Sequence, residues 1–499
     1  MKFTRRDFLK KSGGLALTTL SSPLLAACQN LVTAGGASVT VTPTTTSGSV
    51  REFKLTTTVT PVDLGTGEFK AWTYNGQPVG PEIRVMEGDT LRVILTNNLP
   101  EPTTIHWHGV PVPNAMDGVP DMPLPAIQPN ATFTYEFVAQ PSGTYWYHPH
   151  VGYQLDRGLV GPLIIEPRHE PGAYDREYTL VLDDWVTVDG GGPEGKERRP
   201  STMMGGGMMG QSQPQDEDNS QGQGMMGHSL QTGDPLSEPI YHTFTVNGQV
   251  IEASTPFTVK QGERVRLRLI NAGAATTFGL RLAGHSLTVT HTDGRPVEPL
   301  EVDTLRISMG ERYDVTFVAG NPGHWTLYAQ VNDSDEVVDL ATFVYAGSTA
   351  AQDSGDDLPK RLRWNEYQLL TGLPEERLPA ASPQAEQTFD LVLSGGMMSP
   401  EWTINGKVFP HTDPIVVSTG QRVRFNYLNH SPMPHPMHLH GHSFEVVGSP
   451  GLRKDTLIVE AHMGQASIEF VPDNPGDWMH HCHNLYHMEA GMMNVVQVL

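Results

Sequence analysis

The segment HCHNLYHMEAGM, residues 481–492, concentrates side chains that bind soft metals. Successive side chains of a β-strand point to opposite faces, so Cys482 points away from His481 and His483. On its own face the cysteine can meet two further histidines and a methionine: His435, His487 and Met492. A thiolate, two imidazoles and a distant thioether form the ligand set of a blue copper site, whereas zinc prefers four comparable ligands. These residues therefore predict a mononuclear (type 1) copper site with methionine as the weak axial ligand.

Four His-x-His pairs predict a second and larger metal site. The two imidazoles of one pair share a face of a strand, and the four pairs together supply eight: His106, His108, His148, His150, His438, His440, His481 and His483. One such pair is a weak signal, since it is usually two surface residues. Four pairs in equivalent places of a repeat are specific. Because His481 and His483 flank Cys482, three consecutive residues join the two metal regions and give an electron a short path.

Three segments repeat one plan: EGDTLRVILTNNL (87–99), QGERVRLRLINAG (261–273) and TGQRVRFNYLNHS (419–431). Each is a glycine turn followed by an alternating strand and an asparagine. Short β-rich runs broken by Gly, Pro and Asn surround each copy, as is typical of β-sandwiches. A unit of this length repeated in tandem indicates homologous domains rather than a solenoid. We therefore predict an all-β chain of three tandem Greek-key β-sandwich domains over residues 51–172, 173–350 and 351–499.

The repeat predicts which domains hold metal. TIHWHG (104–109) in the first domain and PMHLHG (436–441) in the third occupy equivalent places, as do HPH (148–150) and HCH (481–483). In the second domain the first pair is replaced by Arg281 and Ala283, and the second by Tyr328, Ala329 and Gln330. The second domain is therefore expected to bind no metal through these positions.

The first 50 residues predict export. TRRDFLK (4–10) resembles a twin-arginine signal, and the apolar run after it is too short to span a bilayer. The run ends in LAAC, which resembles a lipoprotein cleavage site with Cys28 as the lipid-bearing residue; a plain secretory signal cleaved nearby is the alternative. We expect a signal at 1–28, a flexible tether at 29–50, and a periplasmic or cell-surface protein attached to a membrane only by lipid.

The overall charge limits the possible partners. The formal net charge of −22 argues against nucleic acid as a partner, since its phosphates would be repelled, and suits attraction of cations. If Cys28 carries lipid, Cys482 is the only remaining cysteine, so no disulfide within the chain is expected. A metal bond would protect this unpaired thiol in an oxidising compartment.

The motifs HWHG, HPH, HPMHLHGHSF and HCHNLYHMEAGM resemble the four ligand motifs of the multicopper oxidases, and the resemblance spans about 50–499. The most similar branch contains three-domain bacterial laccases and copper-efflux or copper-resistance oxidases. The resemblance implies three cupredoxin domains and four copper ions, with the type 1 copper in domain 3 and a trinuclear cluster between domains 1 and 3. By motif position, the type 2 copper takes His106 and His438, and the two type 3 coppers take His108, His148, His150, His440, His481 and His483.

The resemblance also implies an activity. Electrons enter singly at the type 1 copper, pass through Cys482 to the cluster and reduce dioxygen to water. We expect Cu(I) as the donor in a role in copper tolerance; a laccase acting mainly on phenols is the alternative, and a non-catalytic copper-sequestering protein is a third. A monomer is expected.

Asp117, in HWHGVPVPNAMDG, falls where the copper-efflux branch has a carboxylate that carries protons to the cluster; the alternative is a residue of an Asp-Gly turn. Many bacterial members have Glu directly after the type 1 histidine, but this chain has Met488 there and Glu489 one place later. A second proton-relay carboxylate at that spot is therefore in doubt. The copper-resistance oxidases share the methionine.

Several other histidines and methionines are expected to be structural. His285, His291 and His324 lie in the domain without ligands, and His442 and His480 adjoin ligands but fall outside their register. Met433, Met437 and Met479 are expected to pack the type 1 pocket.

A methionine-rich insert, residues 201–229, interrupts the second domain and has almost no apolar side chain to bury apart from its methionines. Thioethers favour Cu(I), so the insert predicts recruitment of cuprous ion by Met203, Met204, Met208, Met209, Met225 and Met226. In the copper-efflux relatives a methionine-rich segment that helps deliver Cu(I) belongs to domain 3. A solvated linker is the alternative.

Overall fold

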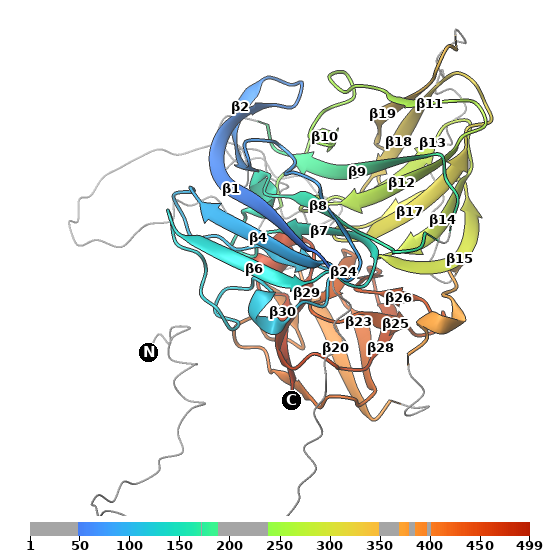
Figure 1. Cartoon of the computed structure of the whole chain (residues 1–499). Coiled ribbons are helices and arrows are strands. Elements are labelled where there is room, and N and C mark those ends of the chain that lie inside the picture. The colour runs from blue at the N-terminus through green and yellow to red at the C-terminus, as the bar shows by residue number, and fades with distance from the viewer. Residues whose placement is uncertain (1–47, 171, 188–237, 349–368, 379–384, 397–400) are drawn as a thin grey trace, which may run out of the picture. The chain divides into compact units, whose positions relative to one another are not determined.

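The computed structural model describes residues 48–170, 172–187, 238–348, 369–378, 385–396 and 401–499, and over these ranges it is nearly all β (Figure 1). Their strands form two sheets in each third of the chain, coloured blue to cyan, green to yellow and orange to red in Figure 1. The fold is thus the predicted series of three cupredoxin-like β-sandwiches. The predicted signal, Cys28 and the six methionines of the insert lie outside the described residues, and the domain limits stay predictions.

Domain 1 pairs two four-stranded sheets. One has the order β2 (Glu68–Tyr74), β1 (Val50–Asp63), β4 (Thr90–Asn97), β6 (Thr132–Val138), and the other has the order β3 (Ile83–Met86), β8 (Gly161–Glu166), β7 (Gly143–His148), β5 (His106–His108). Two short 3-10 helices follow the metal motifs: η1 (Asn114–Met116) and η2 (Leu155–Arg157).

Domain 2 has a six-stranded and a five-stranded sheet. The first has the order β10 (Thr243–Val246), β9 (Arg176–Trp185), β12 (Arg264–Asn271), β17 (Arg312–Val318), β14 (Leu287–Thr292), β15 (Arg295–Val302). The second has the order β11 (Phe257–Val259), β19 (Val337–Tyr345), β18 (His324–Val331), β13 (Phe278–Leu282), β16 (Leu305–Ile307).

Domain 3 repeats this arrangement, and the 3-10 helix η4 (Pro374–Glu376) precedes its first strand. One sheet has the order β21 (Trp402–Ile404), β20 (Gln387–Gly395), β23 (Val423–Asn429), β28 (Gly464–Phe470), β25 (Phe444–Val446), β26 (Arg453–Lys454). The other has the order β22 (Ile415–Val417), β30 (Met493–Val498), β29 (Gly476–Cys482), β24 (His435–Leu439), β27 (Thr456–Val459). The helix α2 (Leu485–Glu489) follows β29 directly.

The alternation of apolar and polar residues explains the central strands. In β4 and β23 every second side chain is buried, which is the period of a strand with one face on the core. Strand β12 is the domain 2 copy, and it is buried on both faces from its second residue onward because domain 2 packs against its neighbours there. This extra burial encloses Arg266 and Arg268, whose partners are carboxylates.

The strand register supports the sequence alignment of the three domains. His106 of β5 pairs with His148 of β7, and in domain 3 His438 of β24 pairs with His481 of β29. The equivalent pair of domain 2, between β13 and β18, is Arg281 and Tyr328. The same backbone frame therefore exists three times, and domain 2 has other side chains at these positions.

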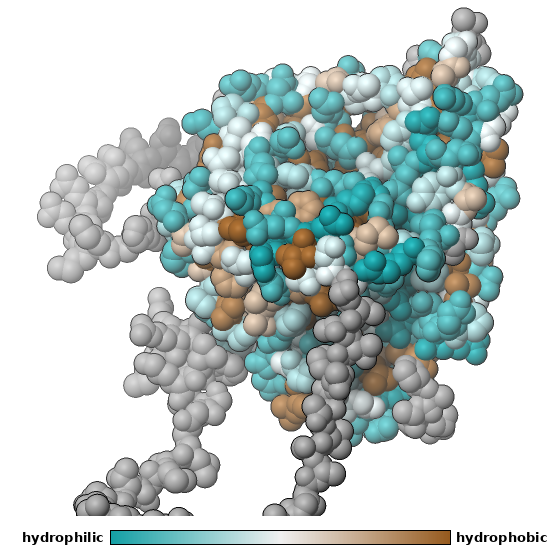
Figure 2. Space-filling view, in the orientation of Figure 1, coloured by the Kyte–Doolittle hydropathy of each residue, from teal (hydrophilic) through white to brown (hydrophobic). Residues whose placement is uncertain are grey.

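The surface is mostly polar. Large exposed apolar side chains are scattered singly, and the face in Figure 2 is largely hydrophilic. No helix within the described ranges is long and apolar enough to cross a membrane.

Candidate metal centres

A first group of ligand atoms surrounds Cys482, at the end of β29. Its Sγ lies 3.6 Å from Nδ1 of both His435 and His487, and these two nitrogens are 3.0 Å apart. All three side chains are fully buried, and burial raises the pKa of the Cys482 thiol. A metal binds cysteine in its deprotonated thiolate form. A sulfur beside two imidazole nitrogens is a donor set that a soft metal prefers, so this arrangement favours a metal site over a free thiol.

The loop after Cys482 closes this first centre. Asn484 caps α2 by accepting hydrogen bonds from the backbone N–H of Tyr486 and His487. The N–H of Cys482 donates to the carbonyl of Met492 at 3.0 Å, which holds this buried methionine beside the cysteine. The structure therefore brings His435, Cys482 and His487 together around one point, with His435 supplied by the neighbouring strand β24, and it places the Met492 backbone beside Cys482.

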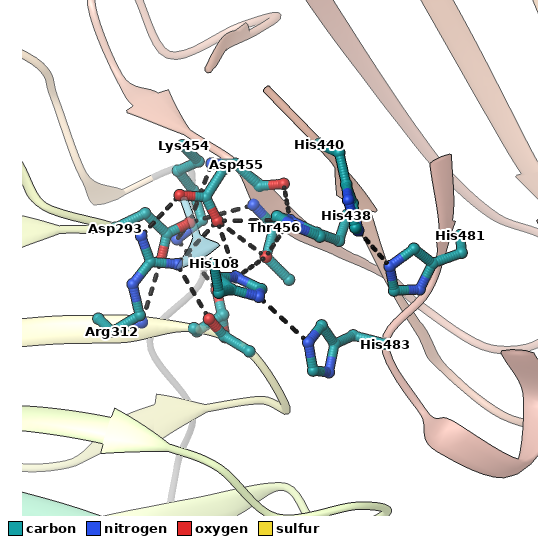
Figure 3. Close-up of polar contacts among 12 residues, drawn as sticks. His108, Asp293, Arg312, His438, His440, Lys454, Asp455, Thr456, His481 and His483 are labelled. Atoms are coloured by element: carbon teal, nitrogen blue, oxygen red, sulfur yellow. Dashed lines mark hydrogen bonds and ion pairs between the residues drawn. The ribbon is translucent and has the colours of Figure 1, made fainter. Parts of the chain in front are cut away.

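A second centre lies between domains 1 and 3, where all eight predicted imidazoles meet. His106 stacks on His440 at 3.8 Å between ring centroids, and His108 stacks on His438 at 3.9 Å, so both stacked pairs join the two domains. His150 Nε2 lies 3.4 Å from His481 Nε2, which in turn lies 3.0 Å from His440 Nε2. Figure 3 shows the part of this centre formed by His108, His438, His440, His481 and His483.

The hydrogen bonds of these rings leave lone pairs directed at the centre. Five of the rings bond a protein oxygen through Nδ1 at 2.8 or 2.9 Å: His106, His148, His438, His440 and His481. An Nδ1 that donates leaves Nε2 as an acceptor. Yet the buried Nε2 atoms of His106, His148 and His438 have no hydrogen-bond partner among the described residues. Such atoms fit bound metal ions.

Electrostatics favours the same conclusion. Burial lowers the pKa of several cluster imidazoles well below the usual value, and the neighbouring rings lower it further: His148, His150, His440, His481 and His483. These rings are therefore neutral at pH 7, which is the form that binds a metal. Nitrogen-rich sites of this kind suit copper.

Comparisons with known proteins decide the family. Multicopper oxidase models match residues 56–170, 209–348 and 382–499. The multicopper oxidase MmcO of Mycobacterium tuberculosis is 38% identical over 506 residues, covering 98% of this chain and 96% of that protein. The chain is a multicopper oxidase. It is accordingly an enzyme that binds four copper ions, one of type 1, one of type 2 and two of type 3, and it uses dioxygen and a reducing substrate.

Further relatives of this multicopper oxidase match it over 90% or more of both chains. Copper resistance protein A of Escherichia coli is 28% identical and covers 100% of this chain and 99% of that protein. The crystal structure of a multicopper oxidase from Pseudomonas thermotolerans is 29% identical, with a TM-score of 0.67, over 91% of this chain and 100% of that one. The structure of the multicopper oxidase Fet3p, at 22% identity, has a TM-score of 0.74 over 90% of each chain, which shows the shared fold.

Asp117 of this oxidase lies at the trinuclear centre rather than in an exposed turn. It directly follows η1 and is 1% exposed. Its Oδ2 accepts a hydrogen bond from His440 Nδ1 at 2.9 Å, and its backbone oxygen accepts one from His106 Nδ1. Its Oδ1 lies 3.2 Å from His106 Nδ1 but accepts no hydrogen bond from the described residues. Asp117 therefore orients a ring from each of domains 1 and 3: His440 through its carboxylate and His106 through its backbone carbonyl.

Sequence reasoning missed Asp455, the second carboxylate of this centre. Its Oδ1 lies 3.2 Å from His108 Nε2, and its carbonyl accepts from His438 Nδ1 at 2.9 Å. Burial alone would raise the pKa of Asp455, but the Arg312 guanidinium outweighs it and holds the pKa well below the usual range. The surrounding RKDTLIV has no recognisable motif, so no sequence signal pointed to it.

Two other carboxylates that contact the segment after Cys482 were also missed. The Oε1 of Glu238 lies 3.2 Å from His487 Nε2. Asp156, in η2, accepts hydrogen bonds from Tyr241 of domain 2 at 2.9 Å and from Tyr486 of domain 3 at 2.5 Å. Burial, and then the charge of Asp184, raise the pKa of Asp156 to about 8.

Four of the histidines expected to be structural bond protein groups: His285, His291, His442 and His480. His480 lies between Tyr427 and Asn494, at 2.9 and 2.8 Å, and His285 bonds the carbonyl of Ala283 and the hydroxyl of Tyr345. His442 bonds the carbonyl of His440. Met437 lies opposite Cys482 in the strand register, Met479 lies in the core, and Met433 packs against the core. His291 lies beside Thr290, and His324 is the first residue of β18. Met488 and Ala490 are buried on either side of Glu489, which is less buried.

Proposed function

We propose that this multicopper oxidase takes electrons from cuprous ion and acts in copper tolerance. The observation that carries the proposal is the Glu238 carboxylate beside His487. It accepts a hydrogen bond from Asn484 Nδ2 at 2.5 Å, and its Oε1 lies 3.2 Å from His487 Nε2, so it lies against the type 1 loop. Its side chain is 10% exposed, against 1% for His487. The carboxylate is thus the more accessible group, and its charge attracts a cation more strongly than a neutral phenol.

Three further features support cuprous ion as the donor. The chain carries a net charge of −22, which draws cations toward its surface. One relative is named copper resistance protein A. In the sequence, the methionine-rich insert ends at residue 229, nine positions before Glu238. Within the proposal, its six thioethers collect Cu(I) and the carboxylate receives it.

The proposal includes the ligand assignment given by the motifs. His435, Cys482, His487 and Met492 hold the type 1 copper, His106 and His438 hold the type 2 copper, and the other six cluster histidines hold the type 3 pair. When bound, the four coppers would supply one-electron transfer and the four-electron reduction of dioxygen, which with four protons gives two waters. The chain contributes the connection: Cys482 faces one centre while His481 and His483, its neighbours in sequence, face the other.

Asp117 is proposed to carry protons to the cluster. One of its carboxylate oxygens is held by His440 and the other accepts no hydrogen bond within the described part of the chain, so the second is available to a water or a proton. A cavity of about 20 Å³ has room for about one water molecule, and its lining includes Gly118, the residue that follows Asp117. A carboxylate in this position can pass protons between such a water and the cluster.

Export completes the proposal. The motifs TRRDFLK and LAAC support passage by the twin-arginine route and a lipid on Cys28, which would place the oxidase in the periplasm or at the cell surface.

The donor is tested by comparing the steady-state kinetics of Cu(I) and a phenol as electron donors, with oxygen uptake as the readout. Glu238→Gln is expected to raise the KM for Cu(I) roughly 5- to 10-fold, equivalent to about 1 kcal/mol of lost attraction, and to leave the KM for phenol almost unchanged. Glu252→Gln, which removes one exposed charge elsewhere on domain 2, is the matched control and should change neither. If the Glu238 variant affects both donors equally, the laccase alternative is favoured.

A further inference from the structure

An arginine of domain 2 reaches the edge of the trinuclear centre, although that domain supplies none of the predicted ligands. Arg312, the first residue of β17, is fully buried and grips Asp455 of domain 3 with both terminal nitrogens, at 2.7 Å to Oδ1 and 2.6 Å to Oδ2 (Figure 3). Its Nε donates to the carbonyl of Thr144 in domain 1 at 3.1 Å. One guanidinium thus contacts all three domains in a fixed, bidentate geometry.

Asp455 connects Arg312 to the predicted copper ligand His108. Its Oδ1 lies 3.2 Å from His108 Nε2, and the hydroxyl of Thr456 lies close to both atoms, at 3.0 Å from the carboxylate and 3.3 Å from the ring. His108 is therefore turned the opposite way from the five rings that bond the protein through Nδ1. Its own Nδ1 faces the cluster, 3.2 Å from His483 Nε2. The carboxylate accepts the Nε2 proton and leaves the Nδ1 lone pair for the metal.

The surrounding charges cannot replace the arginine. Lys454 is the other buried cation in Figure 3, but it bonds Asp293 at 3.1 Å and Glu311 at 3.0 Å, both of domain 2. Asp293 in turn accepts the backbone N–H of Asp455 at 3.2 Å. Lys454 is thus already paired with Asp293 and Glu311. Without the guanidinium, the Asp455 carboxylate would be buried without its cation and free to rotate away from His108.

We infer that Arg312 is a positioning residue for the trinuclear copper cluster: it fixes the Asp455 carboxylate, which holds the His108 ring with Nδ1 toward the metal. Domain 2 thereby contributes to copper binding without supplying a ligand. The inference rests on the proposed ligand assignment of His108.

Arg268 provides a matched control. It is as buried as Arg312, pairs with Asp314 at 3.2 Å and Glu177 at 2.9 Å, and also contacts Thr144, at its hydroxyl. None of these three partners is a predicted copper ligand. Arg312→Gln and Arg268→Gln therefore remove the same buried charge from one sheet of domain 2, and only the first breaks the connection to His108.

The experiment measures the copper content of each purified variant, its copper affinity by competition with a chelator, the near-ultraviolet absorption of the type 3 pair, and the electron paramagnetic resonance of type 2 copper. Arg312→Gln should bind the trinuclear coppers roughly 10- to 100-fold more weakly and lose the type 3 absorption, while the blue type 1 band persists. Arg268→Gln should keep all four coppers. Arg312→Lys, which retains the charge without the bidentate fork, should show a smaller loss, and it decides the question if the glutamine variant does not fold.

Equal copper affinity and spectra in the Arg312 and Arg268 variants would overturn the inference, whether both are normal or both are impaired. His108→Gln tests the ligand assignment of His108 separately from the positioning role of Arg312. If it too keeps full copper content and an unchanged type 3 absorption, the ligand assignment itself has failed; if it loses copper while Arg312→Gln does not, only the positioning role of Arg312 has failed.

Discussion

Replacing Asp156 by asparagine should make the protein more stable than the parent, and increasingly so as the pH rises. This carboxyl is 4% exposed and has a pKa of about 8, chiefly because of burial, against 3.8 for the ordinary group. Below about pH 4 it is protonated whether the chain is folded or not. Between pH 4 and 8 the unfolded chain releases the proton while the folded one retains it, so the free energy of unfolding falls with rising pH.

The size of the effect follows from the two pKa values. Each pH unit between them costs about 1.4 kcal/mol, so the full loss in the parent is on the order of 6 kcal/mol at pH 8. Asparagine has nearly the same shape and never ionises. At pH 4 the variant should equal the parent or fall slightly below it, because the amide oxygen accepts from only one of the hydroxyls of Tyr241 and Tyr486.

Urea unfolding of the copper-loaded parent and variant at several values between pH 4 and 8 measures this difference. Comparing the two proteins at each pH cancels the contribution of copper, which is common to both. Asp335→Asn removes an exposed carboxyl of domain 2 and should give a difference that does not change with pH. If the Asp156→Asn difference also stays flat to within about 1 kcal/mol, Asp156 is ionised in the folded protein, and burial does not control its proton.

The remaining predictions concern the copper centres. Cys482→Ser should abolish the blue absorption and the oxidase activity but keep the fold, because charge transfer to copper needs the sulfur; a variant that stays blue would contradict the assignment. Asp117→Asn should keep the blue colour and four coppers while turnover falls roughly 10- to 100-fold, most at high pH where protons are scarce; equal pH–rate profiles would leave it a structural residue. Deletion of 201–229 should raise the KM for Cu(I) several-fold with phenol oxidation equal or faster, and unchanged Cu(I) kinetics would leave only a linker. Removing copper with a chelator should lower the melting temperature, since the metal binds only the folded chain, and calorimetry of the apoprotein checks this.

The sequence was most informative where the spacing of residues along one strand determines which way their side chains point. His481, Cys482 and His483 must alternate in direction on any β-strand, so the existence of two metal regions followed from three letters. The repeat added the partners, because domains 1 and 3 pair His106 with His148 and His438 with His481 in the same register. Local order and duplication together predicted three sandwiches and the absence of histidine pairs in the second.

The supporting residues could not be predicted in this way. Asp455 lies 347 positions from His108, and their contact exists only because domains 1 and 3 pack together. Arg312 looks in sequence like any charged residue at the start of a strand. Glu238 follows a long insert, and its meeting with His487 depends on how domain 2 docks. Single residues that act across a domain interface leave no periodic signal.

The division of ligands between domains implies an order of assembly. Every predicted type 1 ligand lies between residues 435 and 492, so that centre can form as soon as the last domain has folded. The larger centre requires His150 and His481, 331 positions apart, to come within 3.4 Å, a contact of very long sequence separation that is expected late in folding. A chain stopped before this closure would already be blue but unable to consume oxygen. Colour and oxygen uptake would then report two successive stages of maturation in the same molecule.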